Sequence, residues 1–175
     1  AKVRIVEIVS IAKQTYRLRF DCQEIATRIV PGQFIMIRLA DYDDPLLARP
    51  FALYDTVLGE SGKPVGLDIV YLVLGKMTTR LSGLLPGTEL DVWGPLGNGF
   101  SSQAAGHLVM VAGGIGQTPF PALAQEAFGR RSYGDPPRSF AGMQRVTLCY
   151  GARSSDYLAD ICLLYTSPSP RDLST

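Results

Sequence analysis

Hydrophobic and polar residues alternate in short segments through the first hundred positions, and turn sequences separate the segments. Residues 3–10 are rich in Val and Ile, and residues 15–21 alternate Tyr, Leu and Phe with polar residues, as expected of a strand with one buried face. Further strands are predicted at residues 33–39, 66–73 and 88–94, with a short helix within residues 77–85. This pattern predicts an antiparallel barrel or sandwich.

The pattern changes in the last part of the chain. An apolar segment at residues 107–112 ends in two glycines, residues 118–128 follow with helical spacing, and a second apolar segment occupies residues 146–150. A strand, a glycine turn, a helix and a strand in this order predict the start of a parallel α/β domain. Residues 129–145 are rich in Gly, Pro and Arg, so we expect a surface loop with solvated arginines. Cys149 is expected to be a buried small hydrophobic residue.

Composition and charge exclude several classes of function. Lys and Arg number 17 against 16 Asp and Glu, which argues against the clustered basic surface of nucleic-acid-binding proteins. The 3 cysteines are far apart and there is 1 histidine, so neither a disulfide framework nor a metal site is predicted. No segment has the length of a membrane span and the N-terminus lacks a signal-peptide apolar region, so we expect a cytoplasmic protein with no membrane partner.

Residues 162–172 do not continue the α/β alternation. Their sequence, CLLYTSPSPRD, is identical to a translation of a transposase adapter used to prepare sequencing libraries, and the alternative is a native Pro-rich linker. We therefore set residues 162–175 apart from the functional argument. We also expect the natural protein to continue beyond Ile161, because a two-stranded parallel sheet leaves edges unpaired.

Three segments carry candidate chemistry. The first, RPFALY at residues 49–54, places an arginine, whose planar guanidinium suits a diphosphate, on an aromatic strand. The second, GKMTT at residues 75–79, stands at a helix start, where backbone N–H groups favour an anion. The third, VAGGIGQTP at residues 111–119, is a strand-to-helix turn whose glycines allow close approach to a pyrophosphate. Each segment also has a purely structural interpretation, as a strand start, a helix cap or a tight turn.

The order of these segments resembles the ferredoxin-reductase superfamily, in which a flavin-binding barrel precedes a nicotinamide-binding α/β domain. The strings GTELDVWGPLGNGF and VAGGIGQTPF are most similar to the electron-transfer subunits of bacterial dihydroorotate dehydrogenases. The resemblance implies an all-β antiparallel Greek-key barrel that binds FAD at residues 1–100, followed by the N-terminal half of an NAD-binding α/β domain at residues 101–161. It also implies a 2Fe-2S cluster, on cysteines that only the full-length protein would contain.

The resemblance carries over to particular residues at the first segment. Arg49 would contact the FAD diphosphate, and Phe51, Ala52 and Leu53 would lie along the isoalloxazine ring and the ribityl chain. Many relatives have Tyr and Ser in place of Phe51 and Ala52, so the hydroxyl that could bond to the flavin N5 is missing here. Met77 stands where relatives often have Gly.

The other implied contacts fall into groups by the part of each cofactor that they would touch. They are Tyr71 and Val73 at the adenine or the ring edge, Gly75, Thr78 and Thr79 at the FAD diphosphate, Gly113, Gly114 and Gly116 at the nicotinamide nucleotide, and Gly151 and Arg153 at its adenosine ribose. Pro50 completes the predicted cofactor-binding set. Arg153 alone does not decide between NAD and NADP.

The function implied by the resemblance is electron transfer in dihydroorotate oxidation, a step of pyrimidine synthesis. Electrons would pass from the FMN of a catalytic partner subunit through the cluster to FAD and then to NAD+, within a heterotetramer. The cofactors supply this chemistry, and no side chain is predicted to be a catalytic acid or base. Alternatives are another reductase subunit of the superfamily, such as a hydrogenase or sulfite-reductase diaphorase, a non-catalytic flavin-binding module, and a structural barrel. We expect this chain to retain FAD but to turn over NAD inefficiently.

Overall fold

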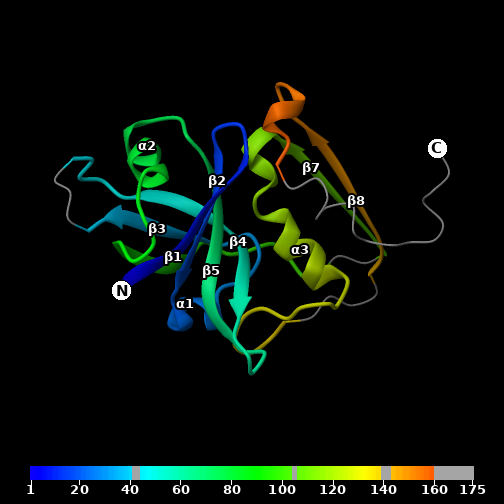
Figure 1. The fold of residues 1–175 in the computed structure, drawn as a ribbon. Coiled ribbons are helices and arrows are strands. Elements are labelled where there is room, and N and C mark those ends of the chain that lie inside the picture. Colours follow the sequence, from blue (N-terminus) through cyan, green and yellow to red (C-terminus); the bar gives the residue numbers. More distant parts are fainter. Residues whose placement is uncertain (41–43, 104–105, 139–142, 160–175) are drawn as a thin grey trace.

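Six antiparallel strands form the barrel that the first part of the sequence predicts. In this computed structural model, which describes residues 1–40, 44–103, 106–138 and 143–159, the strands close in the order β1-β2-β5-β4-β3-β6 (Figure 1). They are β1 (Lys2–Ala12), β2 (Thr15–Asp21), β3 (Phe34–Leu39), β4 (Arg49–Leu58), β5 (Pro64–Leu72) and β6 (Glu89–Leu96). Because β2 pairs with β5 and β3 with β6, the connectivity is of the Greek-key type, as expected.

Alternate residues of the barrel strands fill its interior. Leu18 and Phe20 on β2 are completely buried, and so are Ile35 and Ile37 on β3. The same pattern recurs on the later strands at Leu67, Ile69, Leu90 and Val92. The period of two in the sequence therefore corresponds to the inward and outward faces of the strands.

Two short helices accompany the barrel. The predicted helix is present as α2 (Lys76–Ser82), which buries Met77 and Leu81. Sequence analysis missed α1 (Gln23–Arg28), which packs against β5 and β6 and buries Ile25. Within the described ranges, no helix has the length and apolar character needed to cross a membrane.

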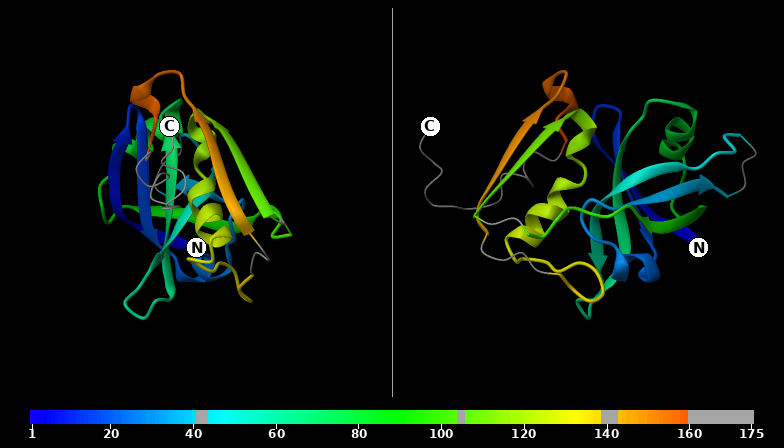
Figure 2. Two further views of the ribbon diagram at one scale, coloured as in Figure 1. Left: turned by 90° about the vertical axis from the view of Figure 1, so that its right-hand side faces the viewer. Right: turned by 180° about the vertical axis from the view of Figure 1, so that it is seen from behind.

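A second unit follows the barrel and contains the predicted parallel strands. It consists of β7 (Gly106–Gly113), η1 (Gly114–Gln117), α3 (Phe120–Ala127), β8 (Met143–Gly151) and η2 (Ser155–Tyr157). β7 and β8 pair in parallel along their length. α3 lies between this sheet and the barrel, so one helix packs against both (Figure 2).

The sheet face that α3 does not cover is exposed, and the predicted burial of Cys149 is wrong. Val109 and Val111 on β7 are 53% and 72% exposed, and Cys149, the register partner of Val111, is exposed as well. Met110 and Ala112, which alternate with these valines, are buried. An apolar strand of a parallel sheet is normally covered on both faces, whereas among the described elements only α3 covers this sheet.

The segment between α3 and β8 also differs from its prediction. β8 begins at Met143, so the loop is shorter than the expected range 129–145. Two of its arginines are mostly removed from solvent, because the side chains of Arg131 and Arg138 are only 20% and 21% exposed and pair with Asp55 and Glu126. The predicted tail at residues 162–175 lies outside the described residues.

The exposure of the sheet face predicts how the cysteines react. In a chain with Cys162→Ser, we expect a thiol reagent to modify Cys149 rapidly and Cys22 only as fast as the protein opens. Cys22 is buried and burial raises the pKa of its thiol, which disfavours the reactive thiolate. Absorbance kinetics with a disulfide reagent measure both phases, and Cys149→Ser should remove the fast one. Two equally slow phases in the parent would contradict the exposed position of Cys149.

Candidate functional site

The predicted flavin residues gather at one end of the barrel. Arg49 to Leu53 open strand β4, and Tyr71 stands near the end of β5. Because β4 and β5 are antiparallel neighbours, the start of one lies beside the end of the other. Phe51 confirms this directly, since its ring contacts the Tyr71 ring edge-on with centroids 5.9 Å apart.

Arg49 is exposed at the start of β4, and its guanidinium contacts backbone carbonyls. Its Nη1 donates to the backbone carbonyls of Leu47 and Ala48, at 3.2 and 3.1 Å. In the part of the chain that the structure describes, no ion pair forms with this guanidinium. Pro50 is exposed beside it, and Ala52 is half-buried. A cation at the rim of the barrel is therefore available to an anionic ligand.

Tyr71 has a buried hydroxyl group with no hydrogen-bond partner among the described residues. Its side chain is 3% exposed, and its ring lies nearly parallel to that of Tyr16, 6.0 Å away. Burial raises the pKa of this hydroxyl, with a further contribution from Tyr16, so the group stays protonated. An unsatisfied buried hydroxyl is costly unless a ligand or water completes it.

The start of α2 presents exposed backbone, but one predicted contact is already used. The Thr78 hydroxyl accepts from the N–H groups of Leu74 and Gly75, at 3.1 and 3.2 Å, and donates to the Gly75 carbonyl. A Cβ added at Gly75 would meet no atom within 4 Å, so the space beside it is open. Thr79 is exposed, whereas Met77 points into the core and leaves that space free.

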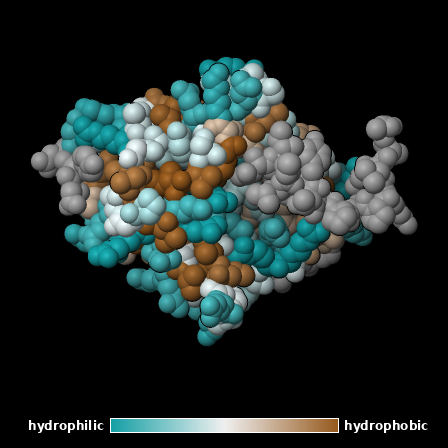
Figure 3. All heavy atoms as spheres, viewed as in Figure 1, coloured by the Kyte–Doolittle hydropathy of each residue, from teal (hydrophilic) through white to brown (hydrophobic). Residues whose placement is uncertain are grey.

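The segment that precedes β4 lies beside α2. Asp44, which precedes Arg49 by five positions, forms ion pairs with Lys76 and with Arg80, the latter at 3.6 Å. This contact brings the first and second candidate segments to the same region. Large exposed hydrophobic side chains accompany them at Leu46, Leu47, Leu74 and Leu85. In Figure 3, hydrophobic side chains form a broken band across the barrel between polar regions.

The third segment forms the predicted strand-to-helix turn. Gly113 ends β7, Gly114 adopts a φ of +53°, and Gly116 lies in η1. A Cβ at any of the three would meet nothing within 4 Å, so the turn has open space before it. Gly151 is the register partner of Gly113, which places the predicted adenosine residue at the same carboxyl edge of the sheet.

Gln117 in this turn is a polar group that the sequence did not single out. Its side chain is completely buried, and neither amide atom has a partner among the described residues. Its burial follows from the position of η1, which contacts β5 of the barrel as well as β7 and β8.

A cavity of about 120 Å³ lies where the barrel meets the second unit. Two predicted nucleotide residues, Gly114 and Arg153, line it together with Leu72 and Leu74, which flank Val73 at the end of β5. Residues that sequence analysis missed complete the lining at Gln14, Thr15, Ile115, Tyr150, Tyr157 and Ala159. The structure thus brings the predicted nicotinamide residues to the barrel strand that carries predicted flavin residues.

The segment after β8 closes this cavity against the β1–β2 turn. The Lys13 N–H donates to the Asp156 carbonyl at 2.9 Å. The Lys13 ammonium and the Arg153 guanidinium lie 5.5 and 5.9 Å from the centre of the Tyr157 ring. Both cations therefore make cation–π contacts with the same ring, that of Tyr157. The described residues contain no group of three His, Cys, Asp or Glu side chains that could hold a metal ion.

Comparisons with known proteins agree with this arrangement. Residues 2–100 match the model of the oxidoreductase FAD-binding domain family. The chain is 38% identical over 125 residues to the dihydroorotate dehydrogenase B (NAD(+)) electron transfer subunit of Desulforamulus reducens, covering 70% of this chain and 46% of that protein. The chain therefore spans about half the length of the curated relatives it matches.

Solved structures share the fold. An NADH-dependent reduced ferredoxin-NADP oxidoreductase superposes with a TM-score of 0.71 at 30% identity, covering 91% of this chain and 51% of that one. Ferredoxin-NADP+ reductase from Plasmodium falciparum, solved with 2'P-AMP, has a TM-score of 0.71 at 16% identity, covering 93% of this chain and 66% of that one. The second likeness shows the fold alone.

Among the described residues, the Tyr71 hydroxyl has no hydrogen-bond partner, whereas the Tyr133 hydroxyl has one. Replacement of each tyrosine by phenylalanine should therefore have different effects on the free energy of unfolding. In the flavin-free chain, Tyr71→Phe should leave the free energy of unfolding unchanged or raise it by up to ~1 kcal/mol, because it removes a buried hydroxyl without a partner. Tyr133→Phe should lower it by ~1–3 kcal/mol, because the Tyr133 hydroxyl donates to the Asp55 carboxylate at 2.7 Å. Urea denaturation followed by circular dichroism compares the two. Equal destabilisation would show that Tyr71 has a partner in the chain.

Proposed function

Because the chain belongs to the oxidoreductase FAD-binding domain family, we propose that it binds FAD at the open end of the barrel and a nicotinamide nucleotide at the Gly-rich turn, and transfers electrons between them. The observation that carries this proposal is the junction cavity, where Gly114 and Arg153 meet the end of β5. Two nucleotides that exchange electrons must approach each other, and a junction between two units is a common place for such a site.

The barrel end fits a flavin dinucleotide in three respects. Arg49 is an exposed cation that has no carboxylate partner among the described residues, which suits a diphosphate. Gly75 has open space beside its Cα, so a phosphate can approach the backbone. The Tyr71 hydroxyl has no hydrogen-bond partner among the described residues, and a polar cofactor atom could supply one.

We propose the following roles for the residues that would hold FAD, and these positions support them. Arg49, Gly75 and Thr79 would hold the diphosphate, while Thr78 would fix the start of α2 through its own backbone contacts. The isoalloxazine ring, the ribityl chain and the adenine would be lined by Pro50, Phe51, Ala52, Leu53, Tyr71 and Val73. Ala52 has no hydroxyl, and the N–H of Leu53 already donates to Gln33. When bound, FAD would supply reversible two-electron chemistry, so the chain needs no acid or base of its own.

The second unit would hold the nicotinamide nucleotide. Gly113, Gly114 and Gly116 leave open space at the carboxyl end of β7, the usual ligand position in an α/β sheet. Gly151 and Arg153 follow the neighbouring strand β8 and would lie at the adenosine ribose. The curated relatives are electron transfer subunits of an NAD(+)-linked enzyme, which favours NAD(H) over NADP.

The wider role that we propose is that of an electron-transfer subunit in dihydroorotate oxidation, the function named for the curated relatives. A catalytic subunit with FMN would then be the partner, in a cytoplasmic heterotetramer, and a 2Fe-2S cluster of the full-length protein would connect the flavins. The exposed leucines at positions 46, 47, 74 and 85 lie close to the predicted flavin residues and favour a protein partner on that side.

A second candidate is a reductase subunit that serves ferredoxin or another electron carrier. The solved structure of an NADH-dependent reduced ferredoxin-NADP oxidoreductase, 30% identical to this chain, favours it. Both candidates share the FAD and nicotinamide steps. Reduction of the bound flavin by dihydroorotate with its catalytic subunit, compared with reduction by ferredoxin, separates them.

Flavin binding tests the role assigned to Arg49. We expect Arg49→Leu to raise the Kd for FAD by roughly 10- to 100-fold, the loss of about one charge-assisted hydrogen bond. The Kd for riboflavin, which has no diphosphate, should not change. Fluorescence quenching measures both constants. Arg4→Leu is the matched control, since Arg4 is exposed on β1 and pairs with Glu89. Equal weakening of FAD and riboflavin would contradict a diphosphate contact.

Anaerobic addition of NADH tests the electron-transfer proposal. The chain with bound FAD should show flavin absorption near ~450 nm, and NADH should bleach it slowly in a single turnover. Dithionite should bleach it completely, as a control for accessible flavin. Bleaching by dithionite alone would leave the flavin assignment intact and remove the nicotinamide assignment. A colourless chain that takes up no added FAD would contradict both.

A further inference from the structure

The segment at residues 129–138, here named the strap, holds the second unit on the barrel through ion pairs that are mostly removed from solvent. The direction in which the strap continues from the end of α3 is fixed, because the N–H groups of Arg130 and Arg131 both donate to the Gln125 carbonyl, at 2.9 and 3.3 Å. Its composition predicts a solvated loop, yet Tyr133 is 2% exposed. The strap therefore belongs to the interface between the two units.

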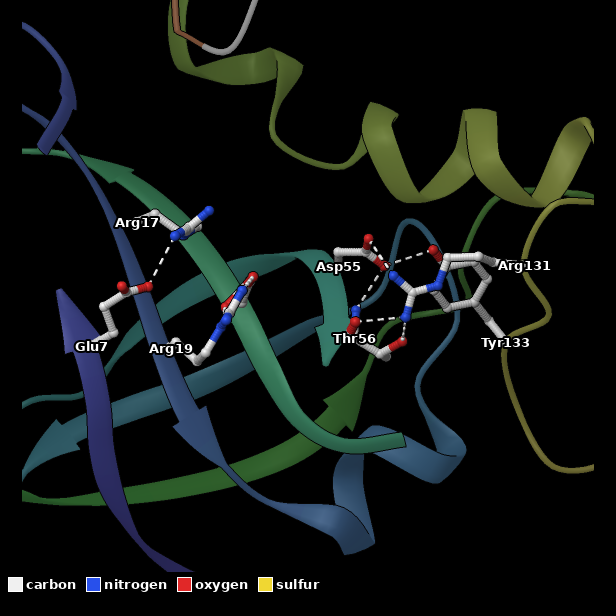
Figure 4. Close-up of polar contacts among 8 residues, drawn as sticks. Glu7, Arg17, Arg19, Asp55, Thr56, Arg131 and Tyr133 are labelled. Atoms are coloured by element: carbon white, nitrogen blue, oxygen red, sulfur yellow. Dashed lines mark hydrogen bonds and ion pairs between the residues drawn. The ribbon is translucent and has the colours of Figure 1, made fainter. Parts of the chain in front are cut away.

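The first anchor joins the strap to strand β4. Arg131 donates from Nη1 to Asp55 Oδ2 at 2.6 Å, and from Nη2 to the Thr56 carbonyl and hydroxyl at 2.6 and 2.9 Å (Figure 4). The Tyr133 hydroxyl donates to the other Asp55 oxygen at 2.7 Å. Asp55 also accepts from the Thr56 N–H. One guanidinium thus makes three contacts to two consecutive residues of β4, and its orientation is fixed.

The charges around the first anchor make its geometry depend on the Arg131 guanidinium. Burial raises the pKa of the Asp55 carboxyl, against the attraction of Arg131, and nearby Asp68 acts in the same direction as burial. Asp68 is the register partner of Asp55 and is neutralised by Arg19, whose Nε and Nη2 donate to it at 2.8 and 2.7 Å. Without Arg131, two adjacent carboxylates would share a single guanidinium.

The second anchor lies at the far end of the strap. Arg138 donates to both Glu126 oxygens on α3, at 2.7 and 2.8 Å, and to the Phe100 carbonyl at 2.7 Å. Glu126 is 3% exposed, so its carboxylate is desolvated, whereas the Arg138 side chain is 21% exposed. Between the anchors, a Cβ at Gly134 would come within 2.8 Å of Val30, which shows how closely the strap follows the barrel. Two separated attachments resist rotation of α3 in a way that one cannot.

We propose that the strap sets the position of the Gly-rich turn relative to strand β4, and that Arg131 is the positioning residue of this contact. The inference rests on the proposed function, since β4 carries the predicted flavin residues and the turn at the start of α3 carries the predicted nicotinamide residues. Within the described ranges, the hydrogen bonds of the anchor residues involve none of the predicted nucleotide residues. Their role is to hold the two sites at a fixed separation, on which transfer between bound reactants depends steeply.

Hydrogen exchange of the flavin-free full chain tests the strap without any cofactor. In Arg131→Met, the amides of α3 and of residues 113–118 should exchange at least ~10-fold faster, because local opening replaces the fixed interface, while amides of the barrel interior remain protected. Arg130→Met is the matched control, because the exposed Arg130 guanidinium lies over the Phe128 ring, 5.1 Å from its centre. Thr56→Val removes one acceptor of Arg131 and should give a smaller change in the same amides.

Flavin reduction provides the second readout. With FAD bound, Arg131→Met should lower the limiting rate of bleaching by NADH by about 10-fold or more. The half-saturating NADH concentration, the Kd for FAD and the rate with dithionite should not change. Arg131→Lys keeps the charge but cannot make the forked contact, so we expect a rate between those of the parent and of Arg131→Met. If Arg131 only stabilised the fold, Arg131→Met would weaken FAD binding as well as slow the reduction. A slower reduction with unchanged binding is therefore the result that indicates a positioning role.

The outcomes separate this inference from the function on which it rests. If α3 exchanges at the parental rate in Arg131→Met and in Arg131→Met/Arg138→Met, the strap does not hold the second unit and the proposal is wrong. If Arg131→Met loses protection throughout the barrel, Thr56→Val decides, and an unchanged α3 in that variant overturns the proposal. If the parent is not bleached by NADH, the nicotinamide function fails, while the exchange result still decides whether the strap positions α3.

Discussion

Pairing of β1 with β6 closes the barrel, and the rest of the structure depends on this closure. Val3 pairs with Leu90, and both side chains are buried in the core. A closed sheet satisfies its own backbone hydrogen bonds and has no free edge, so binding chemistry has to come from its ends and its outer surface. The end formed by the start of β4 and the end of β5 carries exposed Arg49 and the Tyr71 hydroxyl, which has no partner in the described part of the chain. The outer surface of the same two strands receives α3 and η1.

Much of this arrangement could be predicted from the sequence, because local periodicity determines it. The alternation in residues 15–21 identifies β2, and its register places Leu18 and Phe20 inside. The position of the Gly-rich turn is also predictable, since its glycines stand between an apolar strand and a segment with helical spacing. The helix α1 was missed because it has six residues and no side-chain cap at Cys22, so its local signal is weak.

Features that depend on residues far apart in the sequence could not be predicted. Arg131 and Asp55 are 76 positions apart, and nothing in either segment indicates that they meet. Tyr71 and Gln117 look like ordinary residues of a strand and a turn, and only the folded chain reveals that their buried polar atoms lack partners among the described residues. Cys149 was misjudged because the apolar character of a strand does not tell how many of its faces are covered.

The position of α3 between the barrel and the sheet has a consequence for the evolution of this protein. A typical surface helix has a polar face on which substitutions accumulate freely, but α3 packs on β4 on one side and on β8 on the other. Ala122, Leu123 and Ala127 are buried within it, and even Glu126 is buried and paired. A change of volume on this helix disturbs two packing layers at once. The helix should therefore diverge slowly among homologues, and its changes should be correlated with changes in both neighbouring strands.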